Sequence, residues 1–300
     1  MERGAASIAK PIDTLCPSLQ PLTMKNNKIL YISQEITPYL AETPMASLGK
    51  QLPVSMQERG FEVRTFMPKY GCINERRNQL HEVIRLSGMN IIIDDTDHPL
   101  IIKVATLQPS RMQVYFIDSD DYFTTSSGAS APLETVSMAE ENHERMIFFV
   151  RGVVETVKKL RWEPAVVQCM GWITALAPLF MKRMMVDDPS FAEAKVVYTL
   201  RSEGFEGTLD ESFLSLLAPG FAPGDLAALG EGPVGVDDLH RIAMTYADAI
   251  VQGDENVSPE LIEFAKSTGK PFMPYNADLQ SFADSTNELY RGLLGVADED

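Results

Sequence analysis

The stretch Lys28–Pro68, "KILYISQEITPYLAETPMASLGKQLPVSMQERGFEVRTFMP", decides the fold of this chain. It begins with an apolar strand, Lys28–Gln34, and continues into apolar residues at helical spacing within Thr43–Gly60, where Pro53 is expected to kink the helix. The alternating run Glu62–Met67 then predicts a second strand. Because such a crossover is right-handed and joins neighbouring strands in the same direction, the stretch predicts a parallel β-α-β unit.

Three further runs, Ala165–Met170, Lys195–Leu200 and Ala249–Gln252, are almost continuously apolar. Strands of this kind are buried on both faces of a parallel sheet. Together with the amphipathic segments between them, they predict an α/β, Rossmann-like fold with a mainly parallel sheet and helices on both faces.

Other segments predict additions to this plan. The strand-like runs Glu82–Ile93, Pro99–Leu107 and Met112–Asp118 are separated by short polar breaks, which favours antiparallel strands at the sheet edge. Glu134–Leu160 and Ile173–Met185 are expected to be helices, the first with acidic residues early and lysines late.

Two segments are expected to lie outside the regular structure. Residues Met1–Thr23 mix proline, small and polar residues, which predicts a flexible N-terminal arm, and Met24 is an alternative start. Residues 24–300 are expected to form a single domain. Leu217–Gly235, rich in proline and glycine, is expected to be a mobile surface loop.

Charge and composition exclude several partners. The formal net charge of -16 disfavours nucleic acid and anionic membranes. No window approaches the ~20 apolar residues of a membrane span. The three cysteines are odd in number and widely spaced, which is typical of free thiols in a reducing, cytoplasmic compartment.

The usual signatures of catalysis are weak. The four histidines have no metal-ligand spacing, and no cysteine has an evident base. The acidic run Asp118–Phe123 could bind a divalent cation but is more typical of a solvated turn. The sequence therefore predicts no catalytic residue, metal or cofactor.

An ordered series of motifs carries a resemblance to a known family. The motifs are "KILYISQEITPYL", "FMPKYG", "ENHERM", "QCMGWITALAPLFMKRM", "VVYTLRSEGFEG", "YADAIV" and "VSPELIEFA". In this order they resemble the N-terminal catalytic domain of bacterial glycogen and starch synthases, the family 5 glucosyltransferases. The resemblance implies the N-terminal half of a two-domain type B glycosyltransferase fold, which transfers glucose from ADP-glucose to an α-1,4-glucan. It also implies that the residues after Asp278 are too few for the second domain.

The chain departs from the family where the donor phosphate is held. The family pattern of a lysine, a spacer and two glycines falls on Ala41, Glu42, Thr43 and Pro44. Proline has no N–H to donate and Glu42 adds a negative charge. Two further signatures are also replaced. An aspartate, tryptophan and histidine fall on Gly171, Trp172 and Ile173, and a histidine and asparagine fall on Arg201 and Ser202.

A residual ligand pocket is one interpretation of the polar residues that remain, and it would be lined by Glu35, Trp172, Arg201, Glu203 and Glu206. The alternative is that these residues are caps, buried ion pairs and packing residues, with Trp172 in the core.

The resemblance with lost signatures leads to three hypotheses. The first is a non-catalytic relative that acts as a binding or regulatory protein through the face that the second domain would cover, with an unknown protein or a glucan as its partner. The second is half of a split ADP-glucose-dependent α-1,4-glucan synthase, complemented by a separate second domain. The third is a glucan-binding module without chemistry. Self-association is left open.

Overall fold

The computed structural model describes residues 26–123, 142–230 and 232–296. The predicted arm Met1–Thr23 and the alternative start Met24 lie outside the described residues. The first part of the helix expected from Glu134 also lies outside them.

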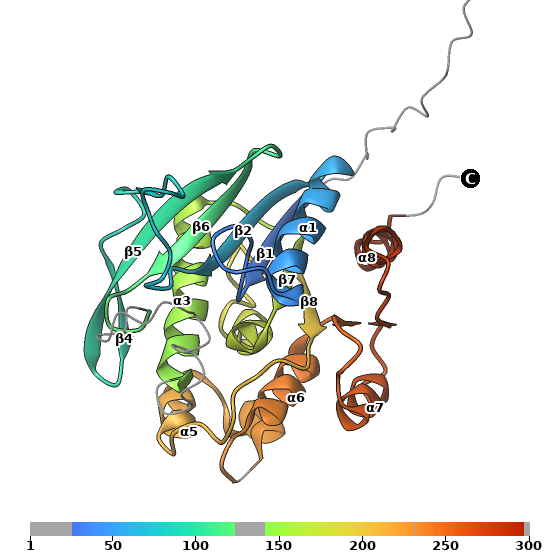
Figure 1. The fold of residues 1–300 in the computed structure, drawn as a ribbon. Helices are drawn as coiled ribbons and strands as arrows, with labels where there is room; N and C mark the ends of the chain where they lie inside the picture. Colours follow the sequence, from blue (N-terminus) through green and yellow to red (C-terminus); the bar gives the residue numbers. More distant parts are fainter. Residues whose placement is uncertain (1–25, 124–141, 231, 297–300) are drawn as a thin grey trace, which may run out of the picture.

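A single large sheet organises the described residues (Figure 1). Its order is β10-β9-β8-β7-β1-β2-β6-β5-β3, and β4 pairs with β5 beside this path. All pairs from β10 to β6 are parallel, whereas β5 is antiparallel to β6, β3 and β4. The strands are β1 (Lys28–Ser33), β2 (Glu62–Pro68), β3 (His81–Glu82), β4 (Met89–Ile93), β5 (Thr96–Leu107), β6 (Met112–Asp118), β7 (Val166–Met170), β8 (Lys195–Leu200), β9 (Ala249–Gln252) and β10 (Phe272–Met273).

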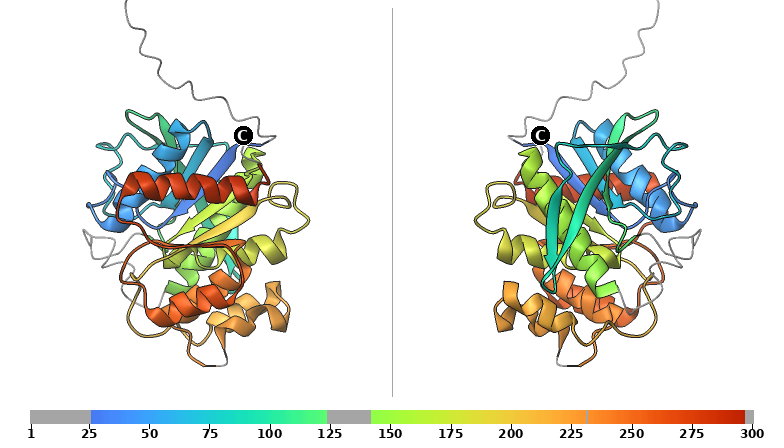
Figure 2. Two further views of the ribbon diagram at one scale, coloured as in Figure 1. Left: turned by 90° about the vertical axis from the view of Figure 1, so that its right-hand side faces the viewer. Right: turned by 90° about the vertical axis from the view of Figure 1, so that its left-hand side faces the viewer.

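Helices cover both faces of the sheet. α1 (Pro44–Glu58) and α8 (Leu279–Leu293) contact each other on one face. α3 (Asn142–Leu160) and α6 (Val236–Tyr246) lie on the other face, and α7 (Pro259–Ser267) packs against α6. Figure 2 shows α8 crossing the sheet in one view and α3 in the opposite view. The predicted α/β fold, with a mainly parallel sheet and helices on both faces, is confirmed.

Local sequence explains where the helices begin. The hydroxyl of Thr43 accepts the N–H of Ala46 at 2.9 Å, and Pro44 occupies the first helical position of α1. The helix continues past Pro53 and ends before Gly60, which has a φ of 91°. Capping thus gives α1 the same start that the sequence predicted.

A buried polar network attaches α8 to the sheet. The hydroxyl of Tyr290 donates to Gln168 Oε1 at 2.8 Å and lies 3.1 Å from the hydroxyl of Tyr31. Gln168 in turn donates to the hydroxyl of Thr199. Because these groups are buried, each partner satisfies a polar atom that would otherwise be costly.

Four expectations for individual segments were wrong. The strand expected over Glu82–Ile93 is divided, because only His81–Glu82 and Met89–Ile93 are strands. Met112–Asp118 is not an antiparallel strand throughout, because β6 pairs in parallel with β2 and only its other side is antiparallel. The helix expected over Ile173–Met185 is divided into η2 (Trp172–Thr174), α4 (Ala177–Leu179) and a π-helical turn, η3 (Phe180–Met184). Leu217–Gly235 is not an irregular loop in its described part, since it contains the helical turns η4 (Ala218–Gly220) and η5 (Pro223–Leu229).

His240 of α6 should make stability depend on pH. Its Nδ1 lies 2.8 Å from the hydroxyl of Tyr198, and burial lowers the pKa of the imidazole from 6.5 to about 4, although the charge of Asp254 opposes this shift. Between pH 4 and pH 6.5, His240 therefore binds a proton in the unfolded chain but not in the folded chain. We expect this group to cost about 3 kcal/mol of unfolding free energy as pH falls from 6.5 to 4.

The measurement is urea unfolding of the wild type and His240→Asn across this range. The asparagine oxygen can accept from Tyr198 without titrating, so the variant should lose less stability on acidification. His81→Asn, at an exposed position, is the matched control. Parallel decline in the wild type and His240→Asn would refute the expectation.

Candidate functional site

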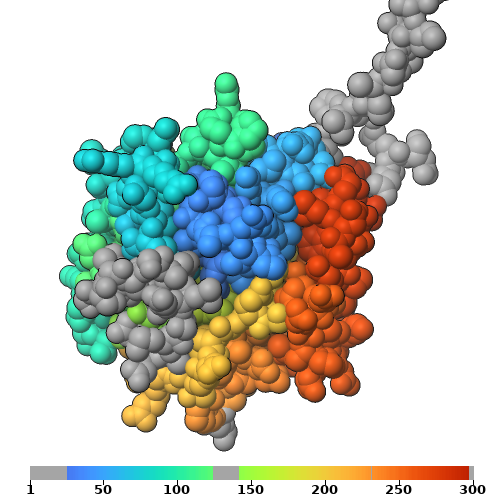
Figure 3. All heavy atoms as spheres, viewed as in Figure 1, coloured from blue at the N-terminus to red at the C-terminus, as the bar shows by residue number. Residues whose placement is uncertain are grey.

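The strand order places a crevice beside the carboxyl end of β1. The chain leaves β1 toward β2 on one side, whereas β7 and β8 lie on the other side. In open α/β sheets, ligands bind where the strand order changes direction in this way. Figure 3 shows the blue β1–α1 segment beside the yellow segment that follows β8 on one face of the molecule.

Gly171, directly after β7, marks the closest approach in this crevice. Its φ is 92°, and a Cβ at this position would lie 2.7 Å from both Cβ and Oε1 of Gln34. The space that a side chain would need is therefore filled by Gln34, and only glycine adopts this backbone without strain.

Arg201 lies directly after β8 and is buried in the crevice, with only 2% of the residue exposed. Its Nε donates to Glu203 Oε2 at 2.8 Å, and Nη2 donates to Oε1 of the same carboxylate. Nη1 donates to the carbonyl of Gly253 at 2.8 Å, and Asp254 Oδ2 lies 3.9 Å from Nε. Glu203 thus binds the guanidinium in the bidentate geometry that arginine and carboxylate groups favour.

Glu35, at the end of β1, adds a buried carboxylate. Its Oε2 accepts the hydroxyl of Thr43 at 2.9 Å. Burial raises the pKa of Glu35, the negative charge of Glu203 raises it further, and hydrogen bonds from Thr43 and the charge of Arg201 act against this. Polar groups at the N-terminus of α1 therefore already have partners, since the Thr43 hydroxyl accepts the N–H of Ala46 and donates to Glu35.

A pocket of about 230 Å³ opens beside these groups. Arg201 and Asp254 lie on one side of it and the first turns of α1 on the other. The remaining wall comes from residues before and within the start of α8, including Tyr275 and Phe282.

The predicted site residues fall into separate environments. Glu35, Arg201 and Glu203 lie together and influence one another electrostatically. Trp172 is 1% exposed and packs edge-to-face on Phe205, with ring centroids 4.9 Å apart. Glu206 is exposed.

The positions at which the family motifs are replaced also differ in how exposed they are. Ala41 is exposed in the β1–α1 loop, Pro44 is exposed at the first position of α1, and Ile173 is fully buried. Ser202 is exposed, and its backbone N–H donates to Asp254 Oδ2 at 2.8 Å.

Sequence reasoning missed the turn Gly253–Asp254. Asp254 accepts backbone N–H groups from Ser202 and Asn256, each at 2.8 Å, and so connects the ends of β8 and β9. The dipeptide "GD" directly after the apolar run of β9 could have indicated this turn, because parallel strands of one sheet end at the same edge.

Several buried polar atoms at the same edge of the sheet make no hydrogen bond within the described part of the chain. They are Ser33 Oγ and Gln34 Oε1 at the end of β1, and Asp118 Oδ1 and Ser119 Oγ at the end of β6. Such atoms usually pair with water or a ligand. The described residues contain no cluster of three or more side chains suited to a metal ion, and none of their helices is long and apolar enough to cross a membrane.

The fold and the position of the crevice define a Rossmann-like α/β domain. The model of the starch synthase catalytic domain family matches residues 28–270. The chain belongs to this family.

Curated relatives agree with this assignment. The chain is 32% identical over 279 residues to a glycogen synthase of Chlorobium limicola, covering 90% of this chain and 57% of the relative. It is 33% identical over 243 residues to a glycogen synthase of Chlorobaculum tepidum, covering 81% of this chain and 49% of the relative. The chain thus spans about half the length of the curated relatives it matches.

The fold is also similar to a solved structure, the catalytic domain of starch synthase IV from Arabidopsis thaliana bound to ADP and acarbose. The TM-score is 0.63 at 17% identity, over 83% of this chain and 51% of that one.

Restoring the family aspartate at position 171 should destabilise the protein. Gly171→Asp would introduce a side chain at positive φ and a clash with Gln34, so we expect a loss of about 2–5 kcal/mol of unfolding free energy. Gly232→Asp adds the same charge where a Cβ would meet nothing within 4 Å, and it serves as the control. Urea unfolding measures both, and equal stabilities of the two variants would contradict the close approach at Gly171.

Proposed function

We propose that this domain does not transfer glucose by itself and that it acts as a binding or regulatory member of its family. Its ligand would be a protein partner or a glucan, bound on the face formed by the carboxyl ends of the strands. The observation that carries the proposal is the engagement of Arg201 by Glu203 and the Gly253 carbonyl.

The charges around Arg201 support this proposal. An incoming phosphate would have to displace Glu203, which already accepts hydrogen bonds from Nε and Nη2 along one edge of the guanidinium. Glu35 and Asp254 lie beside the same site and would repel a dianion.

The N-terminus of α1 is poorly suited to bind a phosphate. A helix N-terminus binds anions through free N–H groups. Pro44 has no N–H, and the N–H of Ala46 is already bound to the Thr43 hydroxyl. The pocket of about 230 Å³ is also smaller than the ~300–1,000 Å³ typical of sites for drug-sized ligands.

Half of a split glucan synthase is the second candidate function. It is favoured by the unpartnered polar atoms at the ends of β1 and β6, which need a ligand or water, and by the identity to glycogen synthases. Glucosyl transfer that appears only after cell extract is added would support this candidate. Retention on a glycogen gel without transfer would instead support the glucan-binding form of the main proposal.

The direct test is calorimetric titration with ADP-glucose and with ADP. We expect the wild type to bind each more weakly than about 1 mM. Glu203→Gln loses one charge and frees part of Arg201, so ADP should bind this variant about tenfold more tightly. Glu206→Gln removes an exposed charge nearby and is the control. Low-micromolar binding of ADP-glucose by the wild type would overturn the proposal.

A further inference from the structure

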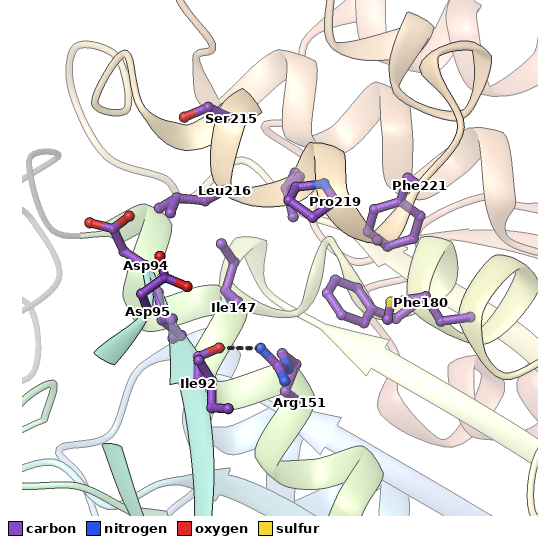
Figure 4. Close-up of a pocket in the computed structure, with 14 residues that line it drawn as sticks. Ile92, Asp94, Asp95, Ile147, Arg151, Phe180, Ser215, Leu216, Pro219 and Phe221 are labelled. Carbon is purple, nitrogen blue, oxygen red and sulfur yellow. Dashed lines mark hydrogen bonds between the residues drawn. The ribbon is translucent and has the colours of Figure 1, made fainter. Parts of the chain in front are cut away.

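A second hollow lies apart from the crevice. It has a volume of about 410 Å³, within the range typical of small-molecule sites. The tip of the β4–β5 hairpin, α3, η3 and the segment from α5 (Phe213–Leu217) to Phe221 enclose it (Figure 4). It shares no lining residue with the pocket beside Arg201.

The walls of this hollow are largely apolar. Phe180 and Phe221 meet edge-to-face, with ring centroids 5.1 Å apart and planes at 79°. Ile147 of α3 continues this surface. At the rim, Ile92 is 54% exposed and Met184 is 41% exposed, although both are large hydrophobic residues. An apolar molecule seated here would remove these surfaces from water.

Arg151 of α3 supplies a positive charge to the hollow. Its Nη1 donates to the carbonyl of Ile92. Within the described ranges its other donors make no hydrogen bond, and no carboxylate forms an ion pair with it. Burial lowers the pKa of Arg151, and the charge of Glu155 opposes this. A half-buried guanidinium with unused donors favours an anionic ligand group.

Asp94 and Asp95 give the hollow its second polar edge. Their φ values of 48° and 57° place both residues in the left-handed region, as a two-residue hairpin turn requires. Figure 4 shows Asp94 and Asp95 on the side of the hollow near Leu216, with Arg151 below them beside Ile92. These carboxylates disfavour a second anionic group on the ligand.

We propose that this hollow binds a small amphipathic monoanion, an aromatic or branched aliphatic molecule with one carboxylate or sulfonate. The anionic group contacts Arg151, and the apolar body lies against Phe180 and Phe221. Asp94 and Asp95 restrict the ligand to a single negative charge. This site is independent of the function proposed for the crevice.

The test uses two fluorescent probes with the same aromatic body. One is 8-anilinonaphthalene-1-sulfonate, which has one negative charge, and the other is neutral N-phenyl-1-naphthylamine. The wild type should bind both saturably under native conditions. Arg151→Met should weaken binding of the sulfonate about tenfold and change binding of the neutral probe by less than about twofold.

Two further variants complete the design. A Cβ at Gly220 would lie 3.5 Å from Met184 Sδ, an ordinary contact, so Gly220→Leu should fill the hollow without strain and weaken both probes. Arg77→Met removes a positive charge from an exposed position and should change neither. Thermal unfolding of each variant checks that it is folded.

Equal effects of Arg151→Met on both probes, or binding unchanged by Gly220→Leu, would overturn the proposal. Loss of probe binding through self-association of the wild type, detected by size-exclusion chromatography, would also overturn it, because the hollow would then be an interface between copies.

Discussion

The candidate site depends on the buried charge of Arg201. A guanidinium taken out of water is tolerated only when carboxylates and hydrogen-bond acceptors compensate it. Here the compensation comes from Glu203 on the same segment and from the Gly253 carbonyl at the end of the neighbouring strand. The interaction therefore determines how the segments after β8 and β9 meet. Gly253 permits this approach, since a Cβ would lie 2.5 Å from Thr199 Cγ2 and 2.9 Å from Arg201 Cγ.

The remaining features of the crevice are consistent with this constraint. Glu35 contacts Thr43, Gln34 fills the space beside Gly171, and Asp254 accepts the N–H of Ser202. The crevice lies where α/β proteins of this kind bind ligands, yet many of its polar groups satisfy one another. The chain thus has the fold of its family, and polar groups at the strand ends contact one another.

Much of the fold could be predicted because burial on both faces leaves a clear sequence pattern. β1, β8 and β9 appear as apolar runs, and Thr43–Pro44 marks the start of α1. The direction of β6 could not be predicted, because alternation of polar and apolar residues does not specify which strand lies beside it. The divided helix after Gly171 was missed since periodicity does not separate α from 3₁₀ and π hydrogen bonding.

The site was less predictable than the fold. Glu35, Arg201 and Glu203 follow apolar strands, so their positions at the sheet edge could be anticipated. Their pairing could not, because the Arg201–Gly253 contact joins residues 52 positions apart. The same limit applies to Arg151 and Ile92, which are 59 positions apart.

The central claim, that Arg201 is held by internal partners, is tested most directly by nuclear magnetic resonance of its side-chain Nε–H. The signal can be assigned by its loss in Arg201→Lys, and the wild type is then titrated with inorganic pyrophosphate. We predict a signal that exchanges slowly with water and keeps its position throughout the titration. A progressive, saturable shift of this signal would show that an external anion reaches the guanidinium and would contradict the account.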